Sequence, residues 1–571
     1  MKKLLTVLLA TMLLLLPLSS LVGCNRGDER EVDPTKTQFY IGNYDGGVGR
    51  TWIETLALQF EEDYKDTHFE DGKTGIQIWF SHMKDEYKSG NILTTMPNYR
   101  EDIYFLDSII YEDFVSQNRL LDISDVLLTP NELDTPLEDG TYPTIASKTE
   151  PTRLALYEYT DDTYYAMPFF DHVLGIVYDV DLFESENLYN NGDGPDGKPD
   201  TYDDGLPRTY EEFKQLLATM KQKGITPFTW CGGDGGYRMD LLNEVWLRYE
   251  GYANFNLNNT FNGEYTFPES RLTAEEAAEW NATTNSDGSQ TVKITAENGY
   301  LLQKQEGKLV ALNFAKDILS DTAYYSSAAF HTSQMHTDAQ EEYLMSIRRP
   351  LGSNQIAMLV EGSWWENEAK PVFNEMAESY NTPSRKYGYG ERRFGIMPLP
   401  VFEGGKSDNA LYMGKGNSAI VVSATTKHPE LAKLFLKYIH TNENLAYFNA
   451  ETCITRPYDY TMTDDQFNSM TYYGQTLREL VTADGIQKIY SQTADTTIRM
   501  KDSTYFNDWM WGSTINGNPY NDPFLTFRDT ANASITAEVY FNGLSATYNK
   551  GSWSKQYAEW VQKGYVQNTV A

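Results

Sequence analysis

MLVEGSWW (residues 358–365) ends an apolar run with two adjacent tryptophans. One ring that follows a strand can pack into the core, but neighbouring side chains on a strand point to opposite faces, so both rings cannot point inward. One of the two indoles is therefore expected to face outward. Its role depends on what the rest of the chain builds around it.

The segments around this stretch alternate between strand-like and helix-like patterns. Short apolar runs typical of buried strands occur at TQFYI (37–41), GIQIWF (75–80) and DIYFLD (102–107). TWIETLALQFEEDYK (51–65) carries apolar residues at helical spacing. LPRTYEEFKQLLATMKQKG (206–224) is predicted to contain a helix with Thr209 as its N-cap and Glu212 completing a capping box. The alternation predicts α/β layers.

Length and composition narrow the class of protein. The chain has 571 residues, which is enough for two or more packed units. Its formal charge is -34, so the surface repels phosphate backbones and anionic lipid headgroups, and nucleic acid is excluded as a partner. Aromatic residues make up 14%, and tyrosine and tryptophan combine an apolar face with a polar edge. Neutral, hydroxyl-rich or cationic molecules remain as candidate ligands.

The N-terminus predicts export. MKK precedes an apolar run over residues 4–18, and LVGC (21–24) resembles the lipobox of bacterial lipoproteins. We predict a lipoprotein signal peptide at 1–23, lipidation of Cys24, and a flexible tether over 24–36. The alternative is an ordinary secretory signal with an incidental cysteine. The other two cysteines, Cys231 and Cys453, are expected to be buried thiols, with a single bridge left open.

NGDGPDGKPDTYDD, which begins at residue 191, is a glycine-rich loop crowded with carboxylates. It contains GxGxxG spacing, but its charge would repel a pyrophosphate and no strand precedes it, so we reject a dinucleotide site. Hard oxygen ligands on a flexible loop suit calcium, and the loop loosely resembles calcium-binding repeats. We predict a structural calcium ion there; the alternative is an acidic, solvated turn. The predicted ligands are Asp193, Asp196, Asp200, Asp203 and Asp204.

Motifs of catalysis are missing from the sequence. HExxH, GxSxG and histidine or cysteine clusters with metal-ligand spacing do not occur. The 81 acidic residues permit many carboxylate pairs, so the presence of such a pair does not indicate a glycosidase. We therefore predict that the protein is not an enzyme and requires no cofactor.

Several motifs occur in the order of a known family. They are GVGRTWIETLALQFEE, NRLLDISDVL, YYAMPFFDHVLGIVYDVDLFE, LPRTYEEFKQLLATMKQKGITPF, QIAMLVEGSWW, FGIMPLP and KGNSAIVVSATTKHPELAKLFLKYI. In this order they resemble the extracellular solute-binding proteins of bacterial ABC importers, in the carbohydrate-binding branch that includes the maltodextrin-binding protein. The strongest single match is QIAMLVEGSWW.

The resemblance implies an α/β fold of the type II periplasmic-binding-protein kind, with two lobes joined by several crossing segments. We expect the N-terminal lobe to comprise residues 37–170 with 414–456. The C-terminal lobe would comprise 171–413 with much of 457–571. Residues 253–300, rich in polar residues and glycine, are predicted to be a surface elaboration with little core of its own.

In α/β proteins, ligands bind at the carboxyl ends of strands, where loops converge. Together with the resemblance, this rule predicts the ligand-binding residues Asp45, His82, Asp107, Asp171, His172, Trp230, Trp364, Asn417 and Trp511. In the family, a ring at the position of Trp364 stacks on sugar, because an indole can cover the apolar face of a pyranose. Trp365 is then expected to pack within the lobe.

The prediction for function is a lipid-anchored receptor on the outer face of the cell membrane. It binds a carbohydrate, in particular an oligosaccharide, between its lobes and delivers it to the permease of an ABC transporter. A monomer is expected, with membrane contact through the lipid anchor only. Two alternatives from another class are a secreted glycoside hydrolase and a surface protein that retains polysaccharide. Within binding proteins, a peptide or polyamine ligand remains an alternative.

Overall fold

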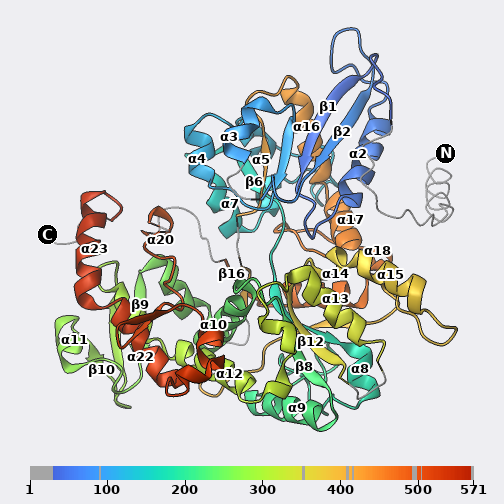
Figure 1. Cartoon of the computed structure of the whole chain (residues 1–571). Helices are drawn as coiled ribbons and strands as arrows, with labels where there is room; N and C mark the ends of the chain where they lie inside the picture. The colour runs from blue at the N-terminus through green and yellow to red at the C-terminus, as the bar shows by residue number, and fades with distance from the viewer. Residues whose placement is uncertain are drawn as a thin grey trace.

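The computed structural model shows two α/β lobes, one above the other in Figure 1. The residues that the structure describes are 30–88, 92–349, 354–406, 410–414, 417–490, 498–502 and 504–566. The predicted signal peptide and the predicted lipidation site Cys24 lie outside these residues. Within the described ranges, no helix has the length and apolar character needed to cross a membrane.

A five-stranded sheet with the order β2-β1-β3-β15-β6 forms the N-terminal lobe. Its strands are β1 (Thr37–Asn43), β2 (Ile76–His82), β3 (Ile103–Leu106), β6 (Ala166–Pro168) and β15 (Ala419–Val422). β1 runs parallel to β2 and β3, whereas β15 is antiparallel to both β3 and β6. The carboxyl ends of β1, β2 and β3 therefore lie along one edge of the sheet, where Asn43 is paired in register with His82.

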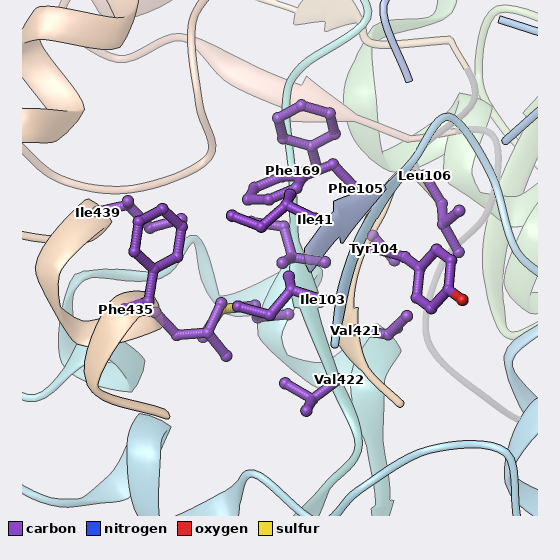
Figure 2. Packing of buried hydrophobic residues seen from close by; sticks show 14 of the residues in the cluster. Ile41, Ile103, Tyr104, Phe105, Leu106, Phe169, Val421, Val422, Phe435 and Ile439 are labelled. Carbon is purple, nitrogen blue, oxygen red and sulfur yellow. The ribbon is translucent and has the colours of Figure 1, made fainter. Parts of the chain in front are cut away.

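Helices from two separate parts of the sequence, 51–157 and 429–452, cover this sheet. They are α2 (Thr51–Asp63), α3 (Ile92–Thr95), α4 (Tyr111–Ser116), α5 (Ser124–Leu128), α6 (Ile145–Lys148), α7 (Pro151–Tyr157), α16 (Pro429–Ile439) and α17 (Asn442–Thr452). Between α7 and β6 lies a small hairpin of β4 (Glu158–Thr160) and β5 (Thr163–Tyr164). Figure 2 shows how Ile41 and Phe105 from the sheet, Phe169 and the α16 residue Phe435 contribute to one apolar core.

A four-stranded sheet with the order β13-β7-β12-β8 forms the C-terminal lobe. Its strands are β7 (Leu174–Asp179), β8 (Thr226–Trp230), β12 (Ile356–Gly362) and β13 (Phe394–Met397). Every residue of β12 is buried, so the run before the tryptophan pair is the central strand expected from its apolar sequence. The capping box of Thr209 and Glu212 is confirmed at the start of α9 (Tyr210–Gln222).

The remaining helices of this lobe flank the sheet or follow it. They are α8 (Val180–Ser185), α10 (Gly236–Thr260), α12 (Glu306–Leu319), α13 (His336–Ser346), α14 (Trp365–Glu368), α15 (Lys370–Tyr380), α18 (Asp464–Ser469), α19 (Tyr472–Thr482) and α21 (Pro523–Arg528). Two short two-stranded sheets complete this part of the chain. β14 (Ala410–Tyr412) pairs with β16 (Gln487–Ile489), and β17 (Ser513–Ile515) pairs with β18 (Asn518–Tyr520).

The lobes are joined by crossing segments that are bonded to one another. The Asp171 N–H donates to the Thr455 carbonyl at 3.0 Å, and the Phe169 N–H donates to the Ser418 carbonyl at 3.2 Å. Three stretches that are far apart in the sequence therefore meet at the connection. The predicted two-lobed α/β fold with several crossing segments is confirmed.

Residues 253–300, predicted to have little core of their own, share a separate aromatic core with C-terminal segments. The strands β9 (Gly263–Phe267), β10 (Thr283–Thr284) and β11 (Gln290–Ile294) form a sheet beside α11 (Ala274–Glu279), α20 (Ile498–Lys501), α22 (Ala537–Thr547) and α23 (Lys550–Gln562) (Figure 1). Phe261 and Tyr265 pack in one cluster with Trp509, Trp553 and Trp560. The C-terminal residues thus supply the core that the insertion alone would lack.

The start of the described chain is part of the N-terminal lobe. The Asp33 N–H donates to Gln77 Oε1 at 2.8 Å, and Arg30 Nη1 lies 3.2 Å from Glu61 Oε1. Residues 30–36, predicted as part of a flexible tether, are therefore bonded to β2 and α2 in this structure. Cys231 and Cys453 are both buried and free, as expected for ordinary thiols.

Candidate ligand-binding site

The two adjacent tryptophans diverge after β12. Trp365 is fully buried and packs within the C-terminal lobe against Tyr343, Phe394 and Tyr473, which confirms the expectation for this ring. Trp364 is only partly buried, and it packs against the core of the opposite, N-terminal lobe. The outward ring of the pair is therefore Trp364.

Glycines on both lobes leave room for the Trp364 side chain. A Cβ added at Gly47, in the N-terminal lobe, would lie 2.5 Å from the Trp364 Cβ. A Cβ added at Gly362, at the end of β12, would lie 2.3 Å from the indole ring. Neither distance is physically attainable, so only glycine fits at both positions while the lobes are in this arrangement. The His172 ring meets the indole edge-on, with centroids 5.6 Å apart.

Polar contacts surround the tryptophan and connect the lobes. The Asn367 side-chain amide donates to the Gly47 carbonyl at 2.6 Å. Lys84 Nζ, from the N-terminal lobe, lies 2.6 Å from Glu368 Oε1 and 3.0 Å from His336 Nε2 in the C-terminal lobe. We call the set Gly47, Lys84, His336, Trp364, Asn367 and Glu368 the inter-lobe contact. Most of its contacts join one lobe to the other, so the two lobes touch at this point in the structure.

Two carboxyl groups next to Trp364 have pKa values shifted in opposite directions. Burial raises the pKa of Glu366 to about 7, and its Oε1 has no hydrogen-bond partner. Burial also raises the pKa of Glu368, but its His336 and Lys84 partners outweigh that effect and lower the value to about 2. Glu368 therefore holds its negative charge for the inter-lobe contact, whereas Glu366 is half-protonated near neutral pH.

Four predicted residues lie at or after the ends of β1, β2 and β3, or on the first crossing segment. His172 Nε2 lies 3.4 Å from Asp107 Oδ1, which joins the crossing segment to the end of β3. His82 stacks on Phe80 with centroids 5.2 Å apart. Asp45 pairs with Arg50 at 2.6 Å. The structure thus brings His172 and Asp107 together beside Trp364, while His82 and Asp45 are held by their own lobe.

Two further predicted residues are bonded to the crossing segments. Asp171 is 1% exposed and accepts from Thr455 Oγ1 at 3.2 Å. The Asn417 side-chain amide donates to the Ile109 carbonyl at 3.0 Å, while its own Oδ1 is buried without a partner. Asp171 is therefore a structural carboxylate of the connection. Asn417 keeps an acceptor unused beside the edge of the N-terminal sheet.

Trp230 and Trp511 are not ligand platforms in this structure. Trp230 is 0% exposed, and rings of Tyr325, Phe330 and Phe524 surround it. Trp511 is 3% exposed and donates its Nε1–H to Asn243 Oδ1 at 2.9 Å. Both predictions are wrong. Trp230 is the last residue of β8, and its ring points into the core of the lobe. The loop that carries Trp511 has a polar sequence, but this ring is packed in the same core.

Carboxylates of the acidic loop are bonded within the loop itself. In the described parts of the chain, no three acidic, histidine or cysteine side chains converge as a metal site would need. The carboxylates instead accept from their own loop: Asp203 Oδ2 from the Asp196 N–H at 2.9 Å, and Asp204 Oδ2 from the Asp200 N–H at 2.8 Å. Four of the five predicted ligands, all but Asp193, take part in these two hydrogen bonds.

The residues that sequence analysis missed are Gly47, Lys84, His336, Asn367 and Glu368. The partners of Lys84 are His336 and Glu368, which are 252 and 284 positions further along the chain. A local sequence pattern cannot predict a contact over such a separation. Asn367 and Glu368 stand directly after the tryptophan pair, so the short distance from Trp364 was the one available signal.

Comparison with known proteins agrees with this architecture. A model of the bacterial extracellular solute-binding protein family matches residues 89–446. A structure from work on xylan utilization by the thermophilic bacterium Caldanaerobius polysaccharolyticus is 14% identical, with 90% of this chain and 100% of that chain covered at a TM-score of 0.52. The GacH receptor of Streptomyces glaucescens, described with acarbose, is 13% identical, with 91% and 99% covered at 0.50. No curated protein matches the chain significantly. The family match spans more than half of the sequence, and this chain belongs to the bacterial extracellular solute-binding proteins.

Proposed function

We propose that the protein binds a carbohydrate, specifically an oligosaccharide, between its two lobes and delivers it to the permease of an ABC transporter. The observation that carries this proposal is the position of Trp364, a partly buried indole that belongs to one lobe and packs against the other. An aromatic face covers the apolar face of a pyranose, and neighbouring carboxylates and amides accept and donate to the hydroxyl groups.

The surroundings of Trp364 supply those polar groups. His172 meets the ring and pairs with Asp107, and Asn367 and Glu368 follow the tryptophan on α14. Such a mixture suits a neutral ligand with many hydroxyl groups. The net charge of -34 disfavours an anionic ligand, because long-range repulsion opposes its approach.

Closure of the lobes is the mechanism that we infer for binding. Lys84, Gly47 and their partners on the C-terminal lobe meet only when the lobes are close together, so a ligand that touches both lobes favours the closed state. The closed form then presents one composite surface to the permease. The ligand is transferred unchanged, since the proposed role requires binding without chemistry.

The family implies an exported protein, and we propose a lipid anchor at Cys24 that holds it on the outer face of the cell membrane. LVGC supports this assignment as a lipobox-like sequence. Two or more acyl chains on one residue give a stable anchor, whereas one chain is marginal. We further propose that the protein acts as a monomer.

A thermal-unfolding screen against mono- and oligosaccharides tests the proposal. A sugar present at 100 times its dissociation constant is expected to add about 2.7 kcal/mol to the free energy of unfolding. Spermidine and a mixed tetrapeptide serve as comparison ligands. Stabilisation by these compounds and by no sugar would contradict a carbohydrate receptor. Hydrolysis of a sugar during prolonged incubation would contradict transport without chemistry.

A further inference from the structure

A cavity of about 90 Å³ lies within the C-terminal lobe. Its walls come from the start of β7, the end of β13, α10, β14, the acidic loop and the segment between α19 and β16. Much of the lining is apolar, with side chains of Val173, Leu174, Ile396, Leu399, Leu411 and Leu480. No residue of the inter-lobe contact lines it. The cavity is therefore separate from the site around Trp364.

One buried carboxyl group on the cavity wall has an oxygen without a partner. Glu244, on α10, is 6% exposed, and its Oε2 accepts from the Tyr412 N–H at 2.8 Å. Among the residues that the structure describes, its Oε1 makes no hydrogen bond. Nearly all buried polar atoms of a folded protein have such a partner. Glu244 thus offers an unused oxygen to a molecule in the cavity.

The protonation state of Glu244 depends on what lies beside it. Burial raises the pKa of Glu244 to about 8, although the Tyr412 N–H and the Arg248 guanidinium act in the opposite direction. At pH 7 the carboxyl group is therefore mostly protonated. A cation next to Oε1 would favour the carboxylate, so Glu244 would release its proton when a cation binds.

The ionisable groups of the cavity favour a cation over an anion. The carboxyl groups on its walls are those of Asp196, Asp203, Glu244 and Asp484, whereas its basic groups are Lys198 and Arg248, and its one phenol is Tyr202. Arg248 Nη2 already donates to the Leu399 carbonyl at 2.9 Å. The carboxyl groups outnumber the basic groups, and the net charge of -34 adds long-range attraction for a cation.

The carboxyl groups of the acidic loop are less available than Glu244. Asp203 is 0% exposed, and its two oxygens accept from the Asp196 N–H at 2.9 Å and from Thr201 Oγ1 at 2.7 Å. Asp196 and Asp484 are exposed to solvent. Glu244 is therefore the carboxyl group that combines burial, an unused oxygen and contact with the cavity.

We propose that this cavity binds a small organic cation, a protonated amine on a short apolar chain, with the ammonium group at Glu244 and the chain against the apolar walls. A cavity of about 150 Å³ holds benzene, so about 90 Å³ suits a molecule of about four non-hydrogen atoms. This site lies outside the one proposed for sugar, so the inference goes beyond the proposed function.

Isothermal titration calorimetry with propylamine, propanol and propionate at about 0.15 M salt tests the site. Propylamine should bind and release about one proton per site at pH 7, which titrations in two buffers of different ionisation enthalpy measure. Its affinity should rise about tenfold from pH 6 to pH 7, because Glu244 ionises more readily at the higher pH. Propanol should bind about tenfold more weakly, since it lacks the charge-assisted hydrogen bond, and propionate should not bind.

Glu244→Gln is expected to weaken propylamine binding about tenfold and to abolish the proton release, while its amide oxygen still accepts from the Tyr412 N–H. Glu250→Gln is the matched control. Glu250 is also a buried carboxyl group of α10, at 2% exposed, but it does not line the cavity. Its oxygens accept from the Gly307 N–H at 2.9 Å and from the Asn254 side-chain amide at 3.2 Å. This variant should bind propylamine as the wild type does.

Three results would overturn the inference. They are no binding of propylamine to the wild type at millimolar concentrations, equal binding of propanol or propionate, and a Glu244→Gln variant with wild-type affinity and proton release. The last result would place the amine elsewhere on the acidic surface. Sugar affinity should be the same with and without propylamine, so a failure here leaves the receptor function untouched.

Discussion

Trp364→Ala is expected to weaken sugar binding by about 2–4 kcal/mol, a loss of about 30-fold or more, because truncation of a central tryptophan removes the largest apolar contact of a binding site. Little stability should be lost in the free protein, since the ring is only partly buried and packs across the gap between lobes. Isothermal titration calorimetry measures the loss of sugar affinity, and thermal unfolding without ligand measures the change in stability of the free protein.

Trp79→Ala provides the matched control for Trp364→Ala. Trp79 is also a partly buried tryptophan, but it lies on the outer strand β2, where its Nε1–H donates to Gln38. Sugar affinity should be unchanged in this variant. If Trp364→Ala instead unfolds far below the wild type and the folded fraction binds normally, Trp364 is a packing residue and the stacking role is refuted.

Glu366→Gln is expected to stabilise the protein by about 3 kcal/mol at pH 8 and to change nothing at pH 4.5. Burial raises the pKa of Glu366 from 4.5 to about 7, so the folded state keeps a proton that the unfolded state has released. The free energy of unfolding therefore falls as the pH rises from 4.5 to 7, and the amide removes this loss while still accepting from Thr471. Urea unfolding of both proteins at pH 4.5, 6 and 8 measures this difference in the free energy of unfolding.

Glu378→Gln is the control for this pH effect. Glu378 is an exposed residue of α15, and an exposed carboxylate loses little hydration on folding. Its variant should follow the wild-type pH dependence. A Glu366→Gln variant that shows the same slope as the wild type between pH 4.5 and 7 would contradict the assignment of a protonated, buried carboxyl beside the inter-lobe contact.

Local sequence patterns predicted those parts of the fold that are determined locally. The capping box of Thr209 and Glu212 specifies where α9 begins, because both side chains bond to the backbone of the same turn. The apolar run before Gly362 specified a buried strand, and the adjacent tryptophans specified that one ring had to leave the core. These inferences need only residues within a few positions of each other.

The site required information that a local pattern does not hold. Trp230 also stands at the end of an apolar strand, yet three aromatic rings from distant segments enclose it. Lys84 finds its partners Glu368 and His336 on the other lobe, so its role depends on how the lobes meet. The insertion at 253–300 gained a core from tryptophans more than 200 residues further along the chain. Tertiary packing decided each of these cases.

Small-angle X-ray scattering of wild type and Gly47→Ala, with and without a saturating sugar, tests most directly whether binding closes the lobes over Trp364. The radius of gyration of the wild type should decrease on binding. In Gly47→Ala, the added Cβ would lie 2.5 Å from the Trp364 Cβ, so compaction should be lost and affinity should fall. Gly72 has a similar positive φ, but a Cβ added there would have nothing within 4 Å, so Gly72→Ala should behave as the wild type. A wild type that binds sugar at an unchanged radius of gyration, or a Gly47→Ala variant that closes as the wild type does, would contradict the account.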